Sequence, residues 1–383
     1  MKKFGQWLAY LIGTPCFYLS HYLLELADRL TGGQYKGFMG KRYATCRYGE
    51  NAYQTPAHVY VNPFTSKNDP LKIEKFKQVG GSAASFNNNG DFDRLLQTAT
   101  HIGATFHLNY GEVPTIVVGD KHGNPCGGSV NKDRRQAVKD TLEGDPLAIH
   151  GAVMIFNFLV DKEIADIVLH YNNGDNKRLI DGILAPAFTP EAIEMFARKN
   201  GKCPLLANPA LLHLDRHCLD HSLIFRHLRG GNFLLQPNYT FILDLKNPDL
   251  KKYGQATPDQ ERDMLFLKAI CDTSNSNTIT IGKNGCLKGN GTGQQSRIAG
   301  VELGLLNLRR ARHDPHGCTE VSDSFFLMTD APEASITAGI SAILSTSRPT
   351  FASKDKEIIE YCQRWGVPLY LIPDAKGRGF FNH

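Results

Sequence analysis

PTIVVGDKHGNPCGG (residues 114–128) contains a short β-branched run, Thr115 to Val118, that predicts a buried strand. The glycine and proline residues that follow predict a tight loop. Lys121 and His122 are therefore expected side by side where a strand ends. In open α/β sheets, ligands bind at the carboxyl ends of the strands.

Lys121 and His122 admit two interpretations. A cation beside an imidazole disfavours the imidazolium form, so His122 is expected to be neutral and able to accept a proton. The alternative is a surface pair in a loop. Other parts of the sequence are needed to distinguish a catalytic site from a surface pair.

Strand-like and helix-like segments alternate on both sides of this stretch, which predicts an α/β fold with a largely parallel sheet. The chain has 383 residues, too many for one typical core. No convincing internal sequence repeat is present. Predicted strands include 58–61, 115–118, 153–156, 183–185, 233–236, 239–243, 278–281 and 369–372; predicted helices include 17–30, 92–102, 132–142, 162–171, 190–199 and 258–270.

Composition narrows the class of protein. The net charge of +5 is spread along the chain and suits an anionic small molecule rather than a nucleic acid. Nine cysteines without a C-x-x-C pair favour a reducing cytoplasm and argue against zinc, and no metal is expected. The apolar stretch 4–30 is interrupted by polar residues, so it predicts an amphipathic helix rather than a membrane anchor.

A glycine-rich loop at 289–293 leads into a helix that begins near Gln294. Backbone amides at such a helix start suit a phosphate or a carboxylate. The glycine spacing matches neither the dinucleotide-binding fingerprint nor a P-loop, so both are rejected. Asn284-Gly285 between two short apolar runs predicts a hairpin.

Eight separate stretches, taken in order, resemble the aminoimidazole carboxamide ribonucleotide (AICAR) transformylase domain of the bifunctional purine-biosynthesis enzymes. The resemblance covers about residues 46 to 383. The stretches are CRYGENAYQ (46–54), SFNNNGD (85–91), KHGNPCG (121–127), DGILAP (181–186), GG (230–231), SN (276–277), GTGQQSR (291–297) and SDSFF (322–326).

The resemblance implies two tandem cytidine-deaminase-like, three-layer α/β units without zinc. The expected boundaries are a helical extension at 1–45, a first unit at 46–205 and a second at 206–383. It also implies formyl transfer from the co-substrate 10-formyltetrahydrofolate to the 5-amine of AICAR, and a homodimer with active sites between subunits. A cyclohydrolase domain is not expected in this chain, so a separate cyclohydrolase would be a partner.

The resemblance also assigns roles to individual residues. His122 is expected to be the base, and Lys121 and Asn277 are expected to stabilise the oxyanion and the leaving group. The nucleotide would be held by Arg47, Tyr48, Asn88, Gly151, Asp181, Arg297, Phe325 and Arg378. The folate would contact Ile298, Phe326 and Asp330. Taken alone, Asp181 fits a turn residue, Phe325 and Phe326 fit a core, and Asn277 fits a strand-edge cap.

The chain departs from the family pattern where the folate would lie. The departures are His150, Leu327, Met328 and Thr329, together with Asp272, Thr273 and Ser274 before Asn277. Arg378 stands one residue out of register with the family's C-terminal pattern. These departures keep two rival hypotheses open: a nucleotide-binding enzyme with another formyl donor or another nucleotide, and a non-catalytic regulatory or interaction module.

Overall fold

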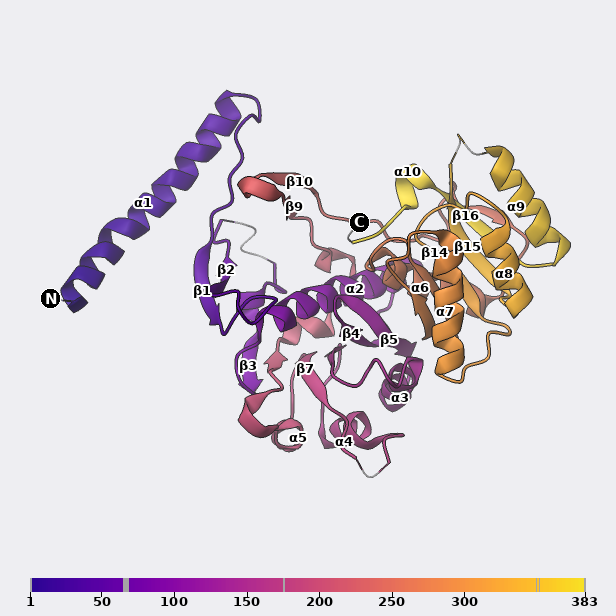
Figure 1. The fold of residues 1–383 in the computed structure, drawn as a ribbon, viewed down its shortest axis with the longest axis horizontal. Coiled ribbons are helices and arrows are strands. Elements are labelled where there is room, and N and C mark those ends of the chain that lie inside the picture. Colours follow the sequence, from indigo (N-terminus) through magenta and orange to yellow (C-terminus); the bar gives the residue numbers. More distant parts are fainter. Residues whose placement is uncertain (1, 65–68, 175, 349, 351, 382–383) are drawn as a thin grey trace.

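The computed structural model describes residues 2–64, 69–174, 176–348, 350 and 352–381. In this part of the chain, one 12-stranded sheet runs through the molecule in the order β11-β16-β15-β14-β12-β13-β5-β4-β6-β7-β8-β3. Helices cover both of its faces (Figure 1). The fold is therefore α/β, as predicted from the alternation of elements.

The half of the sheet that contains Lys121 begins with a long helix and a β-hairpin. Its remaining strands are connected through helices, and β6, β7 and β8 run parallel. The elements are β3 (Lys77–Gly80), α2 (Phe86–Tyr110), β4 (Thr115–Lys121), β5 (Asn124–Asn131), α3 (Arg134–Gly144), β6 (Ala152–Phe156), α4 (Lys162–His170), β7 (Ile180–Ala185), α5 (Pro190–Phe196) and β8 (Leu205–Ala207).

The other half repeats the same order of elements. A helix leads into the hairpin predicted at Asn284-Gly285, and three parallel strands follow, connected through helices. The elements are β11 (Lys251–Tyr253), α6 (Pro258–Asp272), β12 (Ile279–Lys283), β13 (Cys286–Gly291), α7 (Arg297–Arg310), β14 (Thr319–Ser322), α8 (Asp330–Ala338), β15 (Ala342–Ser347), α9 (Ala352–Arg364), β16 (Leu369–Pro373) and α10 (Asp374–Gly377).

The two halves meet where β5 pairs antiparallel with β13, at Ser129 and Cys286. Helices α2 and α6 lie on one face and share a core that includes Phe106 and Phe266. The opposite face carries two further cores, one under α3, α4 and α5 and one under α7, α8 and α9. The strand order β5-β4-β6-β7-β8 matches β13-β12-β14-β15-β16, so the halves share one topology that their sequences do not reveal.

Side chains of β4 point alternately to the two faces of the sheet, and this anchors the strand that leads to Lys121. Ile116 and Val118 point into the core under α2, whereas Val117 points into the core under α3. Both faces of the strand are covered, which is why the sequence is a continuous apolar run. The strand continues to Lys121, three residues beyond the prediction.

Several sequence predictions differ from the structure. The sheet is mixed rather than largely parallel, because each half starts with a hairpin whose turn is two residues long. No strand forms at 239–243, where no regular secondary structure is present. The helix predicted at 92–102 is much longer, since a capping box between Ser85 and Asn88 starts it at Phe86.

The N-terminal segment lies apart from the sheet. Helix α1 (Lys2–Leu30) projects from the body, and the chain after it forms the small antiparallel pair β1 with β2 (Figure 1). A second small antiparallel pair, β9 with β10, forms later in the chain, after β8. Their bounds are Lys41–Cys46, Ala57–Val61, Leu223–His227 and Phe233–Pro237. Among the described residues, no helix has both the length and the apolar character needed to cross a membrane.

Candidate active site

Lys121 and His122 lie at the turn that joins β4 to β5. His122 and Gly123 form the turn with φ values of 57° and 70°, the left-handed pair that a two-residue hairpin favours. The His122 side chain is exposed, and the Lys121 Nζ donates a hydrogen bond to the His150 carbonyl at 2.8 Å. The pair therefore sits at a strand end, with the imidazole accessible and the ammonium held.

Three of the predicted nucleotide-binding residues gather around Lys121. A Cβ built at Gly151, whose φ is 80°, would lie 3.7 Å from the Lys121 Nζ and 4.0 Å from the Asp181 Oδ2. The Asn88 Nδ2 donates to the Asp181 carbonyl at 3.4 Å. The Asp181 carboxylate is bound by Arg198 at 2.6 Å. The structure thus brings Asn88, Gly151 and Asp181 together beside the lysine.

Asn277 and Arg297 lie in the other half of the sheet, and a loop contact connects them to the turn. The Asn275 backbone amide lies 3.5 Å from the Asn124 Oδ1, two residues after His122. Asn277 follows a cis peptide bond, and its Nδ2 donates to the Gln294 carbonyl at 2.8 Å. Arg297 forms an ion pair with the buried Asp323.

A cavity of about 320 Å³ opens beside the turn. Lys121 and His122 line it on one side, and Lys288 and Asn290 of β13 line it on the other. The Asn290 Nδ2 donates to the Pro125 carbonyl at 2.7 Å. The sequence analysis did not select Lys288 or Asn290. The signal was present, because a lysine and an asparagine that alternate with glycines are unusual in a buried hairpin strand.

Arg47 and Tyr48 lie in the loop after β1. Arg47 is exposed and its guanidinium lies 5.9 Å from the Tyr48 ring centroid. The Asn87 Nδ2 donates to the Glu50 carbonyl at 3.4 Å, which holds the loop against the start of α2. This contact places the loop next to Asn88, but no direct contact with Lys121 is present among the described residues.

The remaining predicted residues lie around β14 and the C-terminal segment. Phe326 is 2% exposed, and it packs with Ile298 in the core under α7 and α8. Phe325 is half-buried below the Arg348 guanidinium, 5.3 Å from its ring centroid. Asp330 begins α8 and is exposed. Arg378 lies 3.9 Å from the Asp374 carboxylate and stacks over Phe380 at 5.3 Å.

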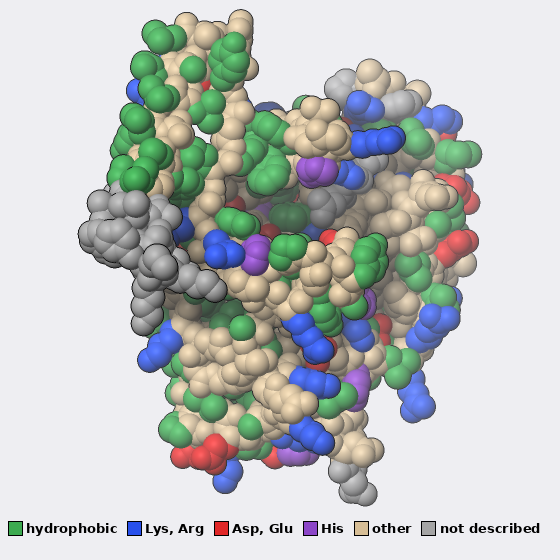
Figure 2. All heavy atoms as spheres, turned by 60° about the vertical axis from the view of Figure 1, so that its left-hand side comes forward, with side chains coloured by type: hydrophobic (Ala, Val, Ile, Leu, Met, Phe, Trp, Pro, Cys, Tyr) green, Lys and Arg blue, Asp and Glu red, His purple; other side chains and the backbone are tan. Residues whose placement is uncertain are grey.

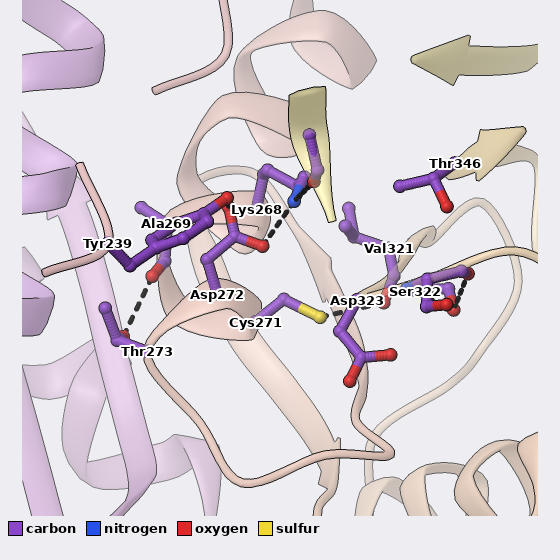
Figure 3. A network of polar contacts seen from close by, with 12 residues as sticks. Tyr239, Lys268, Ala269, Cys271, Asp272, Thr273, Val321, Ser322, Asp323 and Thr346 are labelled. Atoms are coloured by element: carbon purple, nitrogen blue, oxygen red, sulfur yellow. Dashed lines mark hydrogen bonds and ion pairs between the residues drawn. The ribbon is translucent and has the colours of Figure 1, made fainter. Parts of the chain in front are cut away.

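A buried polar network connects α6 to the C-terminal segment, where the Lys268 Nζ donates to the Gly377 carbonyl at 2.7 Å (Figure 3). Lys268 forms an ion pair with Asp272, and the Tyr239 hydroxyl donates to the same carboxylate at 2.9 Å. Burial raises the pKa of Asp272 to about 6, while Lys268 opposes the shift. Asp272 is one of the departures from the family pattern, and its charge is balanced by a lysine one turn earlier on the same helix.

Three further charged residues lie beneath the turn, and sequence reasoning did not select them. Asp91 and Arg94 come from α2, and Asp120 comes from β4. The Asp91 Oδ1 accepts a hydrogen bond from the Gly123 amide at 3.0 Å. Asp120 could have been found from the sequence, because it is an acid at the end of an apolar strand. No cluster of three or more potential metal ligands occurs in the described ranges.

Comparison with known proteins identifies a family. Residues 18–307 match the family model described as the AICARFT/IMPCHase bienzyme. The bifunctional purine biosynthesis protein PurH of Anoxybacillus flavithermus is 29% identical over 323 residues, 84% of this chain and 57% of the relative. The protein of the same name from Listeria welshimeri is 29% identical over 352 residues, 91% of this chain and 62% of the relative.

The PurH protein of Acidithiobacillus ferrooxidans is 27% identical over 358 residues, 92% of this chain and 62% of the relative. The chain therefore spans about three fifths of the length of the curated relatives that it matches. The family model covers well over half of the 383 residues, and it includes both the β4–β5 turn and the β12–β13 hairpin. The chain belongs to the AICARFT/IMPCHase bienzyme family.

Proposed function

We propose that this protein transfers a formyl group from 10-formyltetrahydrofolate to the 5-amine of AICAR, within purine biosynthesis. The observation that carries the proposal is the position of Lys121 and His122. An accessible imidazole and a held ammonium line a cavity. Gly151, Asp181 and Asn88 lie outside that lining, on the side of the lysine. The products would be the formylated nucleotide and tetrahydrofolate.

His122 would act as the base. The 5-amine of AICAR is conjugated with the ring and the carboxamide, so it is a weak nucleophile and must lose a proton as it attacks. A new bond forms between this nitrogen and the formyl carbon. The amine proton passes to the exposed imidazole of His122, which can reach a ligand in the cavity beside the turn.

Lys121 and Asn277 would stabilise the tetrahedral intermediate. Negative charge develops on the formyl oxygen, and preorganised donors and cations lower its energy. The bond from the formyl carbon to the folate nitrogen then breaks, and that nitrogen takes up a proton. The hydrogen bond from Lys121 to the His150 carbonyl supports this role, because it holds the ammonium in one orientation.

The remaining predicted residues would bind the two substrates. Asp181, Asn88 and Gly151 are suited to the nucleotide, and exposed Arg47 is suited to its phosphate. Arg297 would need to share its guanidinium with Asp323. Phe325 would stack on a ring, and Asp330 would accept hydrogen bonds from the pterin, with Ile298, Phe326 and Arg378 as further predicted contacts.

The assay combines purified protein, AICAR and 10-formyltetrahydrofolate, and follows the release of tetrahydrofolate by absorbance. We expect turnover, and we expect His122→Ala to lower kcat by about 10²–10⁴-fold. His170→Ala on α4 removes an exposed imidazole away from the turn and serves as the control. Tight AICAR binding without turnover would contradict the proposal and favour a binding module.

A second candidate is transfer from another formyl donor. Leu327 and Met328 are 51% and 62% exposed in the loop where the family's folate contacts are expected. Exposed apolar side chains favour a different donor surface here. Turnover with another formyl donor, and none with 10-formyltetrahydrofolate, would support this candidate.

We further propose that each half of the sheet is a cytidine-deaminase-like unit and that the protein works as a cytoplasmic homodimer. The shared topology of the two halves supports the first part. Exposed aromatic side chains support a homodimer. Phe38, Phe225 and Phe233 pack against one another and yet remain accessible to a partner. A separate cyclohydrolase remains a predicted partner for the formylated product.

A further inference from the structure

The two halves of the sheet hold their hairpin turns in the same way. Asp91 is the sixth residue of α2, and its carboxylate accepts from the Gly123 amide of the β4–β5 turn. Asp263 is the sixth residue of α6, and its carboxylate accepts from the Asn284 and Gly285 amides of the β12–β13 turn. Both halves therefore use a helix carboxylate that accepts from turn amides to hold the hairpin, which is a structural role.

The half with His122 carries two charged residues that the other half lacks. Asp120 stands two residues before its turn, where the other hairpin has Gly282. Both positions follow a register shift in their strands, which confirms that they correspond. Arg94 is the ninth residue of α2, where α6 has Phe266. The fold can be built with glycine and phenylalanine here, so the charged pair needs another explanation.

Asp120 is held in an unfavourable place for a carboxylate. It is 0% exposed, and neither carboxyl oxygen has a hydrogen-bond partner in the described part of the chain. It lies on the face of β4 that carries Ile116 and Val118, opposite Val153 of β6. Burying an unpaired carboxylate is costly, so a carboxyl group in this environment binds a proton readily.

The charged groups around Asp120 are few and can be named. Asp91 and Arg94 of α2 act on Asp120, and Asp120 acts on Cys126 of β5. Asp93 of α2 also acts on Arg94. Arg94 is itself fixed, because it donates to the Thr273 carbonyl and stacks over the Phe381 ring at 3.6 Å. Beyond this group, His122 and Asp181 face Asp91. Lys121 is bonded to the His150 carbonyl.

These surroundings favour a proton on Asp120 and a negative charge on Asp91. Burial raises the pKa of Asp120 to about 8, and repulsion from Asp91 adds to the shift, while Arg94 and the nearby Gly123 amide oppose it. Burial also raises the pKa of Asp91, but the Gly123 amide, His122 and Arg94 oppose that shift. The protonated form therefore resides mainly on Asp120 at neutral pH, and the negative charge resides on Asp91, next to the imidazole.

We propose that Asp120 holds a proton at neutral pH while Asp91 stays ionised, and that these two acids act, with Arg94, as positioning residues that set the charge beneath His122. Asp91 holds the turn and offers the imidazole a counter-charge. When Asp120 ionises at higher pH, a second negative charge enters beneath the turn and competes for Arg94. The kinetic part of this inference rests on the proposed function, whereas the protonation itself does not.

Infrared spectroscopy tests the protonation without any activity. The carbonyl stretch of a protonated carboxyl group is followed from pH 5 to pH 10 in the wild type, Asp120→Asn and Asp263→Asn. The difference between the wild type and Asp120→Asn is expected to contain a band that disappears near pH 8. A band that is already lost below pH 6, or no difference band, overturns the proposal whatever the protein catalyses.

Kinetics then tests the positioning role. The pH profile of kcat/KM for formyl transfer is expected to fall above about pH 8 in the wild type, and this fall is expected to be absent in Asp120→Asn. Asp91→Asn is expected to lower kcat at least tenfold, while KM for AICAR stays within about threefold. Asp263→Asn breaks the matching contact in the other hairpin, so it should keep the wild-type profile even if it lowers Tm.

The two proposals can fail separately. If the wild type shows no formyl transfer but the difference band titrates near pH 8, the proposed function fails and the protonation of Asp120 stands. If formyl transfer is present and Asp120→Asn keeps the alkaline fall, the positioning role is overturned. It is also overturned if Asp263→Asn changes the profile as Asp91→Asn does, since the effect would then be a loosened hairpin.

Discussion

At the scale of single residues, the site depends on a few backbone conformations and charged side chains around Lys121. His122 adopts a left-handed φ that β-branched residues avoid, and Gly151 adopts a φ of 80° directly beside the lysine. At each residue the backbone conformation is locally unfavourable, but it places the residue in the site. Such residues are where substitutions should affect binding more than folding.

Gly151→Ala should weaken nucleotide binding at a modest cost in stability. The added Cβ would stand 3.7 Å from the Lys121 Nζ, and the positive φ should cost about 1 kcal/mol. Calorimetric titration with AICAR and a urea melt measure the two effects. Gly111→Ala is the matched control, because its φ is 77° and a Cβ there meets nothing within 4 Å. If both variants bind AICAR equally, Gly151 does not face the nucleotide.

Asp120 should make stability depend on pH. Its pKa is raised to about 8 by burial, whereas an unfolded aspartate titrates near 4. The unfolded chain then binds fewer protons than the folded one between these values, so this group's contribution falls as pH rises from about 4 to 8. Asp120→Asn should flatten the fall in the free energy of unfolding between pH 5 and pH 8. Urea melts of the wild type and Asp120→Asn at pH 5 and pH 8 measure this difference. An equal fall in the free energy of unfolding in both proteins would contradict the pKa shift.

At the scale of elements, two capping boxes fix the helices that face the hairpin turns. Ser85 and Asn88 start α2, and Thr257 and Gln260 start α6. In each box the first side chain accepts from the third residue's amide and the third side chain returns the contact. Because Asn88 also donates to the Asp181 carbonyl, the box of α2 connects helix stability to the site.

The two boxes should therefore respond differently to the same change. Ser85→Ala and Thr257→Ala should each lower the free energy of unfolding by about 1 kcal/mol. Ser85→Ala alone should weaken AICAR binding, since Asn88 loses its orientation. Urea melts and calorimetry on both variants make the comparison. Equal binding losses would show that the effect is a general loosening of the fold.

At the scale of the whole molecule, exposed apolar side chains collect outside the sheet. Figure 2 shows hydrophobic side chains over the projecting N-terminal helix and the segments beside it. Phe225 of β9 and Leu234 of β10 are 54% and 56% exposed, and Leu19 and Leu23 of α1 are 58% and 56% exposed. Groups of exposed apolar side chains of this kind often mark an interface.

Leu234→Asp should shift the predicted homodimer towards monomer. A charge in the centre of an apolar interface loses its hydration and finds no partner. Sedimentation velocity at micromolar concentration measures the change. Leu147→Asp alters an 80% exposed leucine before β6 and should leave the assembly unchanged. A wild-type monomer, or a dimer that survives Leu234→Asp, would contradict the use of this surface.

The sequence by itself determined the α/β class, the strand that ends at Lys121-His122, the Asn284-Gly285 hairpin and the family. These follow from short-range signals: a β-branched run, turn residues and ordered motifs. The strand predicted at 239–243 failed because an apolar run forms a strand only where a partner edge is free.

Tertiary structure decided the rest, because it depends on contacts between residues far apart in the chain. Gly151 and Asp181 meet Lys121 only because β6 and β7 lie beside β4 in the sheet. The pairing of β5 with β13 joins two halves whose sequences show no repeat. In the sequence, Asp120 is recognisable only as an acid at the end of an apolar strand. Burial against α2, beside Asp91 and Arg94, is what gives its proton a pKa near that of a neutral solution.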